Sequence, residues 1–145
     1  MSSADAGPVT VLSEERCWEL IAEQKIGRLG TCVERVPDIV PINFVVDDET
    51  IVFRTAEGSK LFALTINQEV AFEVDGWGET SGWSVVLHGR AEQITDYDDV
   101  LHAEALPLQP WVPTVKLHYV RIVPAQVSGR DFAFGPEPDR NYAEP

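Results

Sequence analysis

The chain has 145 residues, of which 44% are hydrophobic and 24% are charged, and its formal net charge is -13 at pH 7. This length suits one domain and leaves little room for a second core. So negative a chain disfavours non-specific binding to nucleic acid or anionic membranes, because their phosphates attract basic surfaces. No apolar stretch is long enough to span a bilayer and no signal-peptide pattern opens the chain, so we expect a cytoplasmic protein.

The N-terminal part of the chain predicts a short disordered segment and then a helix. Residues 1–10 are mostly small and polar, and we expect them to be disordered. Ser13 suits an N-cap, because two glutamates follow it in the first turn, where carboxylates favour the helix dipole. Cys17 falls on the apolar face, and Gly27 is a natural C-cap. The pattern therefore predicts a helix that starts after Ser13 and ends at Gly27.

After this helix the apolar residues recur with a period of two, which indicates strands. Residues 28–34 alternate between apolar and polar side chains, and Pro37-Asp38 predicts the turn that follows. Strands are then expected at 39–46 and 50–55, joined by an acidic turn. Pro41 lies within the second of these strands, and proline is tolerated in a sheet only at an edge or a bulge. Short connections make these three strands an antiparallel meander.

A short helix and two further strands are expected next. Residues 59–67 suit a helix whose apolar side chains cover the sheet, and residues 69–75 alternate as a strand does. A longer strand is expected over 83–94. Gly89 lies inside it and indicates a bulge or a bend at a barrel corner.

The last third of the chain predicts one more helix and the closing strands. The helix is expected over 95–106, a sixth strand over 115–123, and a short final strand over 127–132. The residues 134–145 form an acidic, proline-containing tail that we expect to be loose. Antiparallel strands interrupted by helices predict a mainly β protein with a closed or nearly closed barrel, built as a single domain over 11–133.

The segment that joins the third strand to the next helix predicts an anion site. Arg54 and Thr55 end the strand, a turn with Gly58 follows, and Ser59 and Lys60 open the helix. Free backbone N–H groups at a helix start, a hydroxyl and two cations suit a phosphate group. Either cation alone could instead pair with one of the many surface carboxylates. The anion site is predicted because Arg54, Ser59 and Lys60 are expected to converge on one pocket.

Nucleophilic and metal chemistry find little support. The two cysteines, Cys17 and Cys32, form no CxxC pair, and the three histidines are dispersed without ligand spacing. Cys17 is expected to be a small buried hydrophobe. No metal site is predicted, and Ser59 has no histidine at a plausible motif position.

Several short motifs follow one another over most of residues 11–94. They are Ser13…Leu20 followed by Gly27-Arg-Leu-Gly30, then Val40-Pro-Ile-Asn-Phe44, Phe53-Arg-Thr55, Gly58-Ser-Lys60, Val70-Ala-Phe-Glu-Val-Asp75 and Ser81-Gly-Trp-Ser-Val-Val-Leu-His-Gly-Arg-Ala-Glu92. With these motifs in this order, the chain resembles the small actinobacterial-type branch of the pyridoxamine 5'-phosphate oxidase-like, FMN-binding split-barrel family.

This resemblance implies a six-stranded antiparallel split β-barrel that forms a homodimer with two FMN sites at its interface. Arg54, Ser59 and Lys60 would hold the flavin phosphate, and Thr55 would bond the polar edge of the ring. Trp83 and Trp111 would approach from the partner subunit; the alternative is core or interface packing for Trp83, and packing between prolines for Trp111. The cofactor-binding residues it implies are Pro41, Ile42, Asn43, Phe44, Val52, Phe53, Arg54, Thr55, Ser59, Lys60, Trp83 and Trp111.

The function that follows from the resemblance is electron transfer through FMN, between a reduced nicotinamide or deazaflavin and a small organic molecule. The catalytic residues stay open, because the cofactor does the electron work. One alternative is an F420-dependent reductase on the same fold, with Arg28 or Arg90 helping to hold its longer anionic tail. Others are a non-catalytic protein that stores or senses flavin or binds haem, and a dimeric structural protein. Arg121 and Arg130 are candidates for a substrate phosphate.

Overall fold

The computed structural model describes residues 7–56, 58–108 and 118–140, without the side chains of residues 59, 60 and 62. Its elements are β1 (Val9–Val11), α1 (Glu14–Ala22), β2 (Ile26–Val33), β3 (Val36–Val46), β4 (Ile51–Thr55), α2 (Ser59–Ile66), β5 (Glu69–Trp77), β6 (Ser81–Gln93), α3 (Tyr97–Glu104) and β7 (His118–Ala133).

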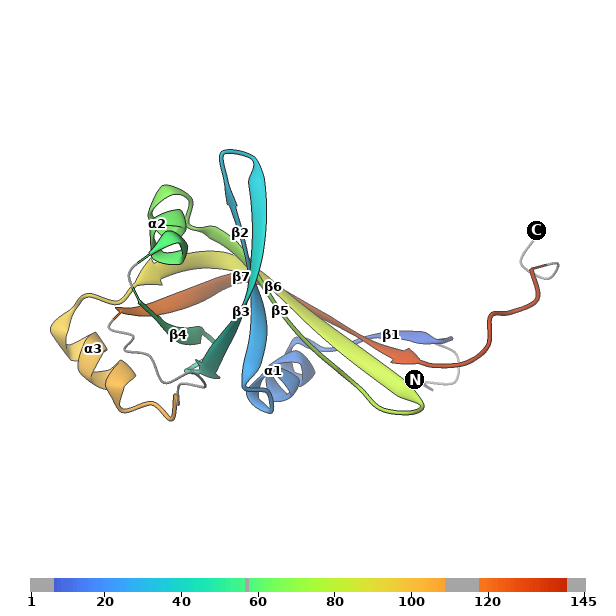
Figure 1. Ribbon diagram of the computed structural model, residues 1–145. Helices are drawn as coiled ribbons and strands as arrows, with labels where there is room; N and C mark the ends of the chain where they lie inside the picture. Colours follow the sequence, from blue (N-terminus) through green and yellow to red (C-terminus); the bar gives the residue numbers. More distant parts are fainter. Residues whose placement is uncertain (1–6, 57, 109–117, 141–145) are drawn as a thin grey trace.

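Six strands form a closed antiparallel ring in the hydrogen-bonded order β7, β4, β3, β2, β5 and β6, and β6 pairs again with β7. β1 adds to β7 outside this ring. Figure 1 shows two extensions from the ring, the β2–β3 hairpin and a long ribbon of β5, β6 and β7. The mainly β, six-stranded barrel predicted from the sequence is confirmed.

The core fills the ring because every second side chain of each strand points inward. Its largest fully buried side chains include Phe53, Phe72, Leu29 and Ile51. The rings of Phe44 and Phe72 meet edge to face, with centroids 4.9 Å apart. Cys17 on α1 is fully buried, as its place on the apolar face predicted, and burial raises the pKa of its thiol.

Helix α1 begins as expected and ends earlier than expected. The Ser13 side chain accepts a hydrogen bond from the Arg16 backbone N–H at 3.1 Å, which confirms the N-cap. The prediction that Gly27 caps the helix was wrong, because α1 ends at Ala22 and Gly27 lies within β2. A side chain there would collide with the Phe72 ring, so close packing and not helix capping requires glycine.

The turn between β2 and β3 also differs from the prediction. It is made by Glu34 and Arg35, whose φ angles of 50° and 70° are those of a tight hairpin turn. Pro37-Asp38, the predicted turn, lies inside β3 and pairs with β2. Pro41 is on an edge as expected, since β3 pairs with β4 only from Phe44 onward.

Strand β7 replaces the two final strands that were predicted. It runs for 16 residues, and its register with β6 shifts where His88 lies opposite Gln126 and Gly89 opposite Pro124, which leaves Ala125 as an extra residue beside the proline. The bulge expected at Gly89 is thereby confirmed. At the other end of the chain, Val9–Val11 pairs with β7 and replaces part of the expected disordered segment.

Helices α2 and α3 begin at Ser59 and Tyr97, close to their predicted starts. No helix in the described ranges is both long and apolar enough to cross a membrane.

Candidate functional site

Strands β3 and β4 separate after only three paired positions, and this opening is where the site residues gather. Phe44 and Phe53 form the last pair, so Asn43 and Arg54 are the first residues on each side of the opening. β3 continues beside β2, where Asn43 lies opposite Ile26, while β4 continues beside β7. The barrel is therefore split between Asn43 and Arg54.

Arg54 is held on its other side by β7. It lies directly opposite Tyr119, and its guanidinium carbon is 5.4 Å from the centroid of the Tyr119 ring. This separation lies within the range of a cation–π interaction. The side chain is half-buried, although the strand around it carries fully buried Val52 and Phe53. Arg54 thus brings a positive charge to the place where β4 leaves β3 and continues beside β7.

Asn43 lies on the β3 side of the opening. Its Nδ2 donates a hydrogen bond to the Lys25 carbonyl at 3.2 Å. Within the described part of the chain, its buried Oδ1 accepts no hydrogen bond. A buried acceptor in this state calls for a ligand or water, since such atoms are nearly always bonded in folded proteins.

A cavity of about 290 Å³ adjoins Asn43. The α1–β2 connection forms one wall and β3 another. Its lining residues are Ala22, Gln24, Lys25, Asn43, Phe44, Val45, Val46 and Pro107. Of these only Asn43 and Phe44 were predicted from the sequence, because nothing in the sequence shows that the α1–β2 connection meets this part of β3.

The other predicted residues on β3 and β4 take two roles. Ile42, Phe44, Val52 and Phe53 are buried in the core, so only their backbone is available to a ligand. Thr55 is 4% exposed, and its hydroxyl donates to the Ala56 carbonyl at 3.1 Å. A bond from Thr55 to a ligand would therefore compete with an existing one.

Helix α2 follows β4 directly. It begins at Ser59, after Gly58 with a φ of 150°, a conformation that side chains rarely adopt. Among the side chains that the structure describes, none caps its first turn. The helix start predicted shortly after Arg54 in the sequence is thus present, while the side chains of Ser59 and Lys60 and all of Trp111 lie outside what the structure describes. Their cofactor roles stay predictions.

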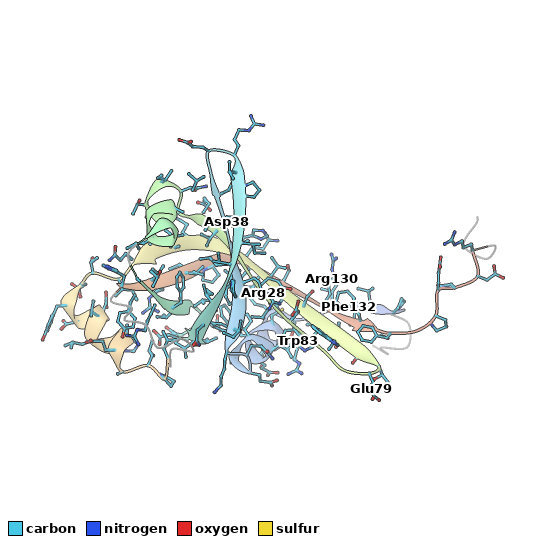
Figure 2. The ribbon with its side chains drawn as sticks, in the orientation of Figure 1. Arg28, Asp38, Glu79, Trp83, Arg130 and Phe132 are labelled. Carbon is cyan, nitrogen blue, oxygen red and sulfur yellow. The ribbon has the colours of Figure 1, made fainter. Side chains whose placement is uncertain are left out.

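Trp83 lies far from these residues. It pairs with Gly76 and with Asp131, whereas Arg54 pairs with Tyr119 at the start of the same β7 strand. That separation along β7 corresponds to roughly 40 Å of extended chain. Figure 2 shows Trp83 on the ribbon together with Arg130 and Phe132. One chain does not bring Trp83 and Arg54 to the same small ligand.

The basic residues considered for a longer anionic tail have protein partners. Arg28 bonds Glu73 at 2.9 Å and Asp75 at 2.5 Å, and Arg90 bonds the Gln68 side chain at 2.6 Å. Burial and the hydrogen bond with Asp75 raise the pKa of Glu73. For Asp75, burial acts in the same direction, but the bonds to Arg28 and Glu73 outweigh it and lower the pKa.

The two arginines considered for a substrate phosphate do not converge within one chain. Arg121 bonds Asp47 at 2.9 Å and Thr50 at 2.6 Å, and His102 of α3 contacts the same carboxylate at 3.0 Å. Arg130 is exposed on the ribbon, roughly 30 Å of extended strand away along β7. Within a single copy, Arg121 and Arg130 therefore cannot bind the same phosphate group.

A larger cavity, of about 680 Å³, lies on the outer face of β2, β3, β5 and β6. Its floor contains the small residues Gly30 and Ala71, and Asp38 and Glu69 bring negative charge to it. The described residues that line it include no lysine or arginine, so this lining does not suit an anion. No cluster of three or more potential metal ligands occurs among the residues that the structure describes.

The family model of pyridoxamine 5'-phosphate oxidase matches residues 13–131. An uncharacterized protein of Mycobacterium tuberculosis strain H37Rv is 46% identical over 97 residues, which are 67% of this chain and 88% of that protein.

Two solved structures are similar over most of their length. The FAD-binding protein from Mycobacterium smegmatis has a TM-score of 0.77 and 42% identity, covering 86% of this chain and 99% of that one. A FAD-binding protein from Mesorhizobium loti has a TM-score of 0.71 and 25% identity, covering 85% and 97%.

Proposed function

Since the chain belongs to the pyridoxamine 5'-phosphate oxidase family, we propose that it binds a flavin nucleotide at the opening between β3 and β4 and acts as a flavin-dependent oxidoreductase. The cofactor proposed first is FMN. The electron donor would be a reduced nicotinamide or deazaflavin, and the acceptor a small organic molecule.

The observation that carries this proposal is the position of Arg54. Arg54 lies at the opening of the barrel, next to the last residue of β4. Helix α2 begins a few residues later in the sequence. A guanidinium beside unpaired backbone N–H groups suits a phosphate, and the net charge of -13 makes such a place unusual on this chain. Ser59 and Lys60 would complete the phosphate site.

The residues around the opening also fit the rest of a flavin. A flavin has N–H and O–H donors on its ring and ribityl chain, and its ring also has a flat apolar surface. On the protein, Asn43 offers a buried acceptor beside the apolar Val45 and Phe44. When bound, the flavin supplies the hydride and electron chemistry. The protein's part would be to anchor the phosphate through Arg54, orient the ring along the β3 backbone, and exclude water with the apolar strand residues.

FAD is a second candidate cofactor, because two similar solved structures are FAD-binding proteins. The deazaflavin F420 has less support. The two arginines that would attract its longer tail, Arg28 and Arg90, already bond Glu73, Asp75 and Gln68.

The protein would work as a homodimer in which Trp83 of one copy reaches the flavin of the other. Support comes from the distance along β7, since Trp83 is too far from Arg54 to share a ligand within one chain. The ribbon that carries Trp83 also extends away from the α2 end of the molecule (Figure 1). A ribbon of this kind is suited to reach a second subunit.

The test is reconstitution with defined ligands. Protein stripped of any cofactor would be titrated with FMN, FAD, riboflavin and F420, following fluorescence quenching. We expect FMN or FAD to bind more tightly than riboflavin by at least tenfold, because riboflavin lacks the phosphate. Equal binding of FMN and riboflavin, or binding of F420 alone, would contradict the proposal.

Catalysis is tested separately from binding. The flavin-loaded protein would be mixed anaerobically with NADH, NADPH or reduced F420. Bleaching of the flavin absorption with any of these donors supports an oxidoreductase. Failure with all of them would favour a protein that stores or senses flavin.

A further inference from the structure

Tyr119, which no sequence pattern singled out, is fixed more firmly than a surface tyrosine. Its backbone pairs with Arg54 of β4 on one side, and its carbonyl accepts a hydrogen bond from the Ile94 N–H at 2.8 Å on the other. The side chain is half-buried and lies beneath the Arg54 guanidinium, 5.4 Å from its central carbon. Tyr119 is therefore a rigid platform under a long and otherwise flexible cation.

The contact with Tyr119 is expected to lower the free-energy cost of binding an anion at Arg54. An arginine side chain has several rotatable bonds, and fixing them when a ligand arrives costs free energy. A guanidinium already held over an aromatic face has lost much of that freedom beforehand. A cation–π contact is made to the face of the ring and uses none of the guanidinium's N–H donors as hydrogen bonds, so it is compatible with a bidentate bond from Arg54 to a phosphate.

We propose that Tyr119 is a positioning residue for Arg54: it holds the guanidinium in the orientation that binds the ligand's phosphate, and does not itself touch the ligand. This inference rests on the proposed function, because it assumes that Arg54 binds a phosphorylated flavin. If Tyr119 has this role, changing it will alter the affinity for phosphorylated ligands only, and the change will depend on the electron density of the ring.

The experiment compares FMN with riboflavin on three proteins: the unmodified chain, Tyr119→Leu and Tyr119→Phe. Loss of the ring in Tyr119→Leu is expected to weaken FMN binding about fivefold, within the range of a partly desolvated cation–π contact. Riboflavin binding is expected to stay unchanged, since it offers no phosphate to Arg54. Tyr119→Phe keeps the ring and is expected to bind FMN within about twofold of the unmodified protein.

An Arg54→Ala background provides the matched control. There, Tyr119→Leu is expected to leave FMN binding unchanged, because the residue that it positions is gone. Equal weakening of FMN and riboflavin by Tyr119→Leu would show a merely structural role and overturn the proposal. So would an additional loss of FMN binding in the Arg54→Ala background.

A second series does not depend on the folding of Tyr119→Leu. Fluorinated phenylalanines at position 119 keep the shape of the ring while fluorine withdraws electron density from its face. FMN affinity is expected to fall with each added fluorine, while riboflavin affinity stays constant. A flat FMN series would overturn the role of Tyr119 even where FMN still binds more tightly than riboflavin. Failure of the unmodified protein to distinguish the two ligands would instead contradict the proposed function.

Discussion

The two ends of strand β7 have opposite characters. At its start, β7 pairs with the short β4 strand and carries Tyr119 and Arg121, which contact Arg54 and Asp47. At its end it belongs to the ribbon, where Trp83, Arg130 and Phe132 are grouped and Trp77 is 78% exposed. The first end has the polar contacts of a binding site, while the second offers aromatic surface that a single chain leaves uncovered.

This difference explains why residues predicted as one site are found in two places. Anion-binding groups need fixed geometry, and the opening between β3 and β4 supplies it through pairing on both flanking strands. Aromatic residues on a projecting ribbon are suited to contact another molecule. The two ends become one site only if a second copy brings its ribbon to the first copy's opening.

The largest effect is expected at the β4 end. Arg54→Ala combined with Lys60→Ala removes both cations of the proposed phosphate site, and we expect FMN affinity to fall by about a hundredfold or more. Isothermal titration would measure it, with size-exclusion chromatography to confirm that the fold is kept. Arg35→Ala in the β2–β3 turn, also an arginine-to-alanine change, is the control. If the double variant retains the affinity of that control, the phosphate is not bound there.

The next prediction tests whether Trp83 acts on the other copy's site. Trp83→Leu is expected to weaken FMN binding about tenfold. Mixing it with the Arg54→Ala, Lys60→Ala variant should then restore function, because each mixed dimer contains one intact site. After random exchange of equal amounts of the two variants, about half of the dimers are mixed. Since one of the two sites in each mixed dimer is intact, about a quarter of all sites are expected to bind FMN normally. No recovery on mixing would show that Trp83 acts within its own chain or only in packing.

A smaller effect concerns the stability of the β4 end. Burial alone would raise the pKa of Asp47, but hydrogen bonds from Arg121 and His102 outweigh it and lower that pKa. A lowered carboxyl pKa contributes stability above the unfolded value, and this is lost as the pH falls through the folded value. Asp47→Asn is therefore expected to cost about 1–2 kcal/mol at pH 7 and less at pH 3.

Urea denaturation at the two pH values measures this difference. Asp38→Asn, an exposed carboxylate in β3, is the control, because its side chain bonds only its neighbour's backbone N–H among the described contacts. A gap between Asp47→Asn and the unmodified protein that stays constant from pH 7 to pH 3 would contradict the pKa argument.

The smallest effect is expected at Asn43. Asn43→Ala removes the buried Oδ1 acceptor together with the Nδ2 bond to Lys25, and we expect FMN and riboflavin affinity to fall equally, by about fivefold. This pattern contrasts with Tyr119, where only the phosphorylated ligand is affected. Loss of FMN binding without loss of riboflavin binding would place Asn43 at the phosphate and not beside the ring or ribityl chain.

Much of the fold follows from local patterns, because strands of a barrel alternate regularly and their turns are short. The strands β2 to β6 and the helix start at Ser59 were predictable for that reason. The errors arose where packing overrides a local rule. Gly27 suggests a helix cap, but it lies in β2, where a side chain would collide with the Phe72 ring. Pro124 suggests the end of a strand, but β7 continues past it through the register shift at Gly89.

The site was less predictable than the fold. A motif could suggest Arg54 as a phosphate ligand, but only the strand register shows that Tyr119 lies beneath it. The same register shows that Trp83 is far away. Alternation along one strand tells which face a residue occupies, and not which residue of another strand it meets.

The most direct test of the account is a crystal structure of the protein with FMN. We expect the phosphate at the start of α2, with its oxygens within hydrogen-bonding distance of the Arg54 guanidinium and that guanidinium still over the Tyr119 ring. A phosphate bound elsewhere, with Arg54 paired to a carboxylate of the protein, would contradict it.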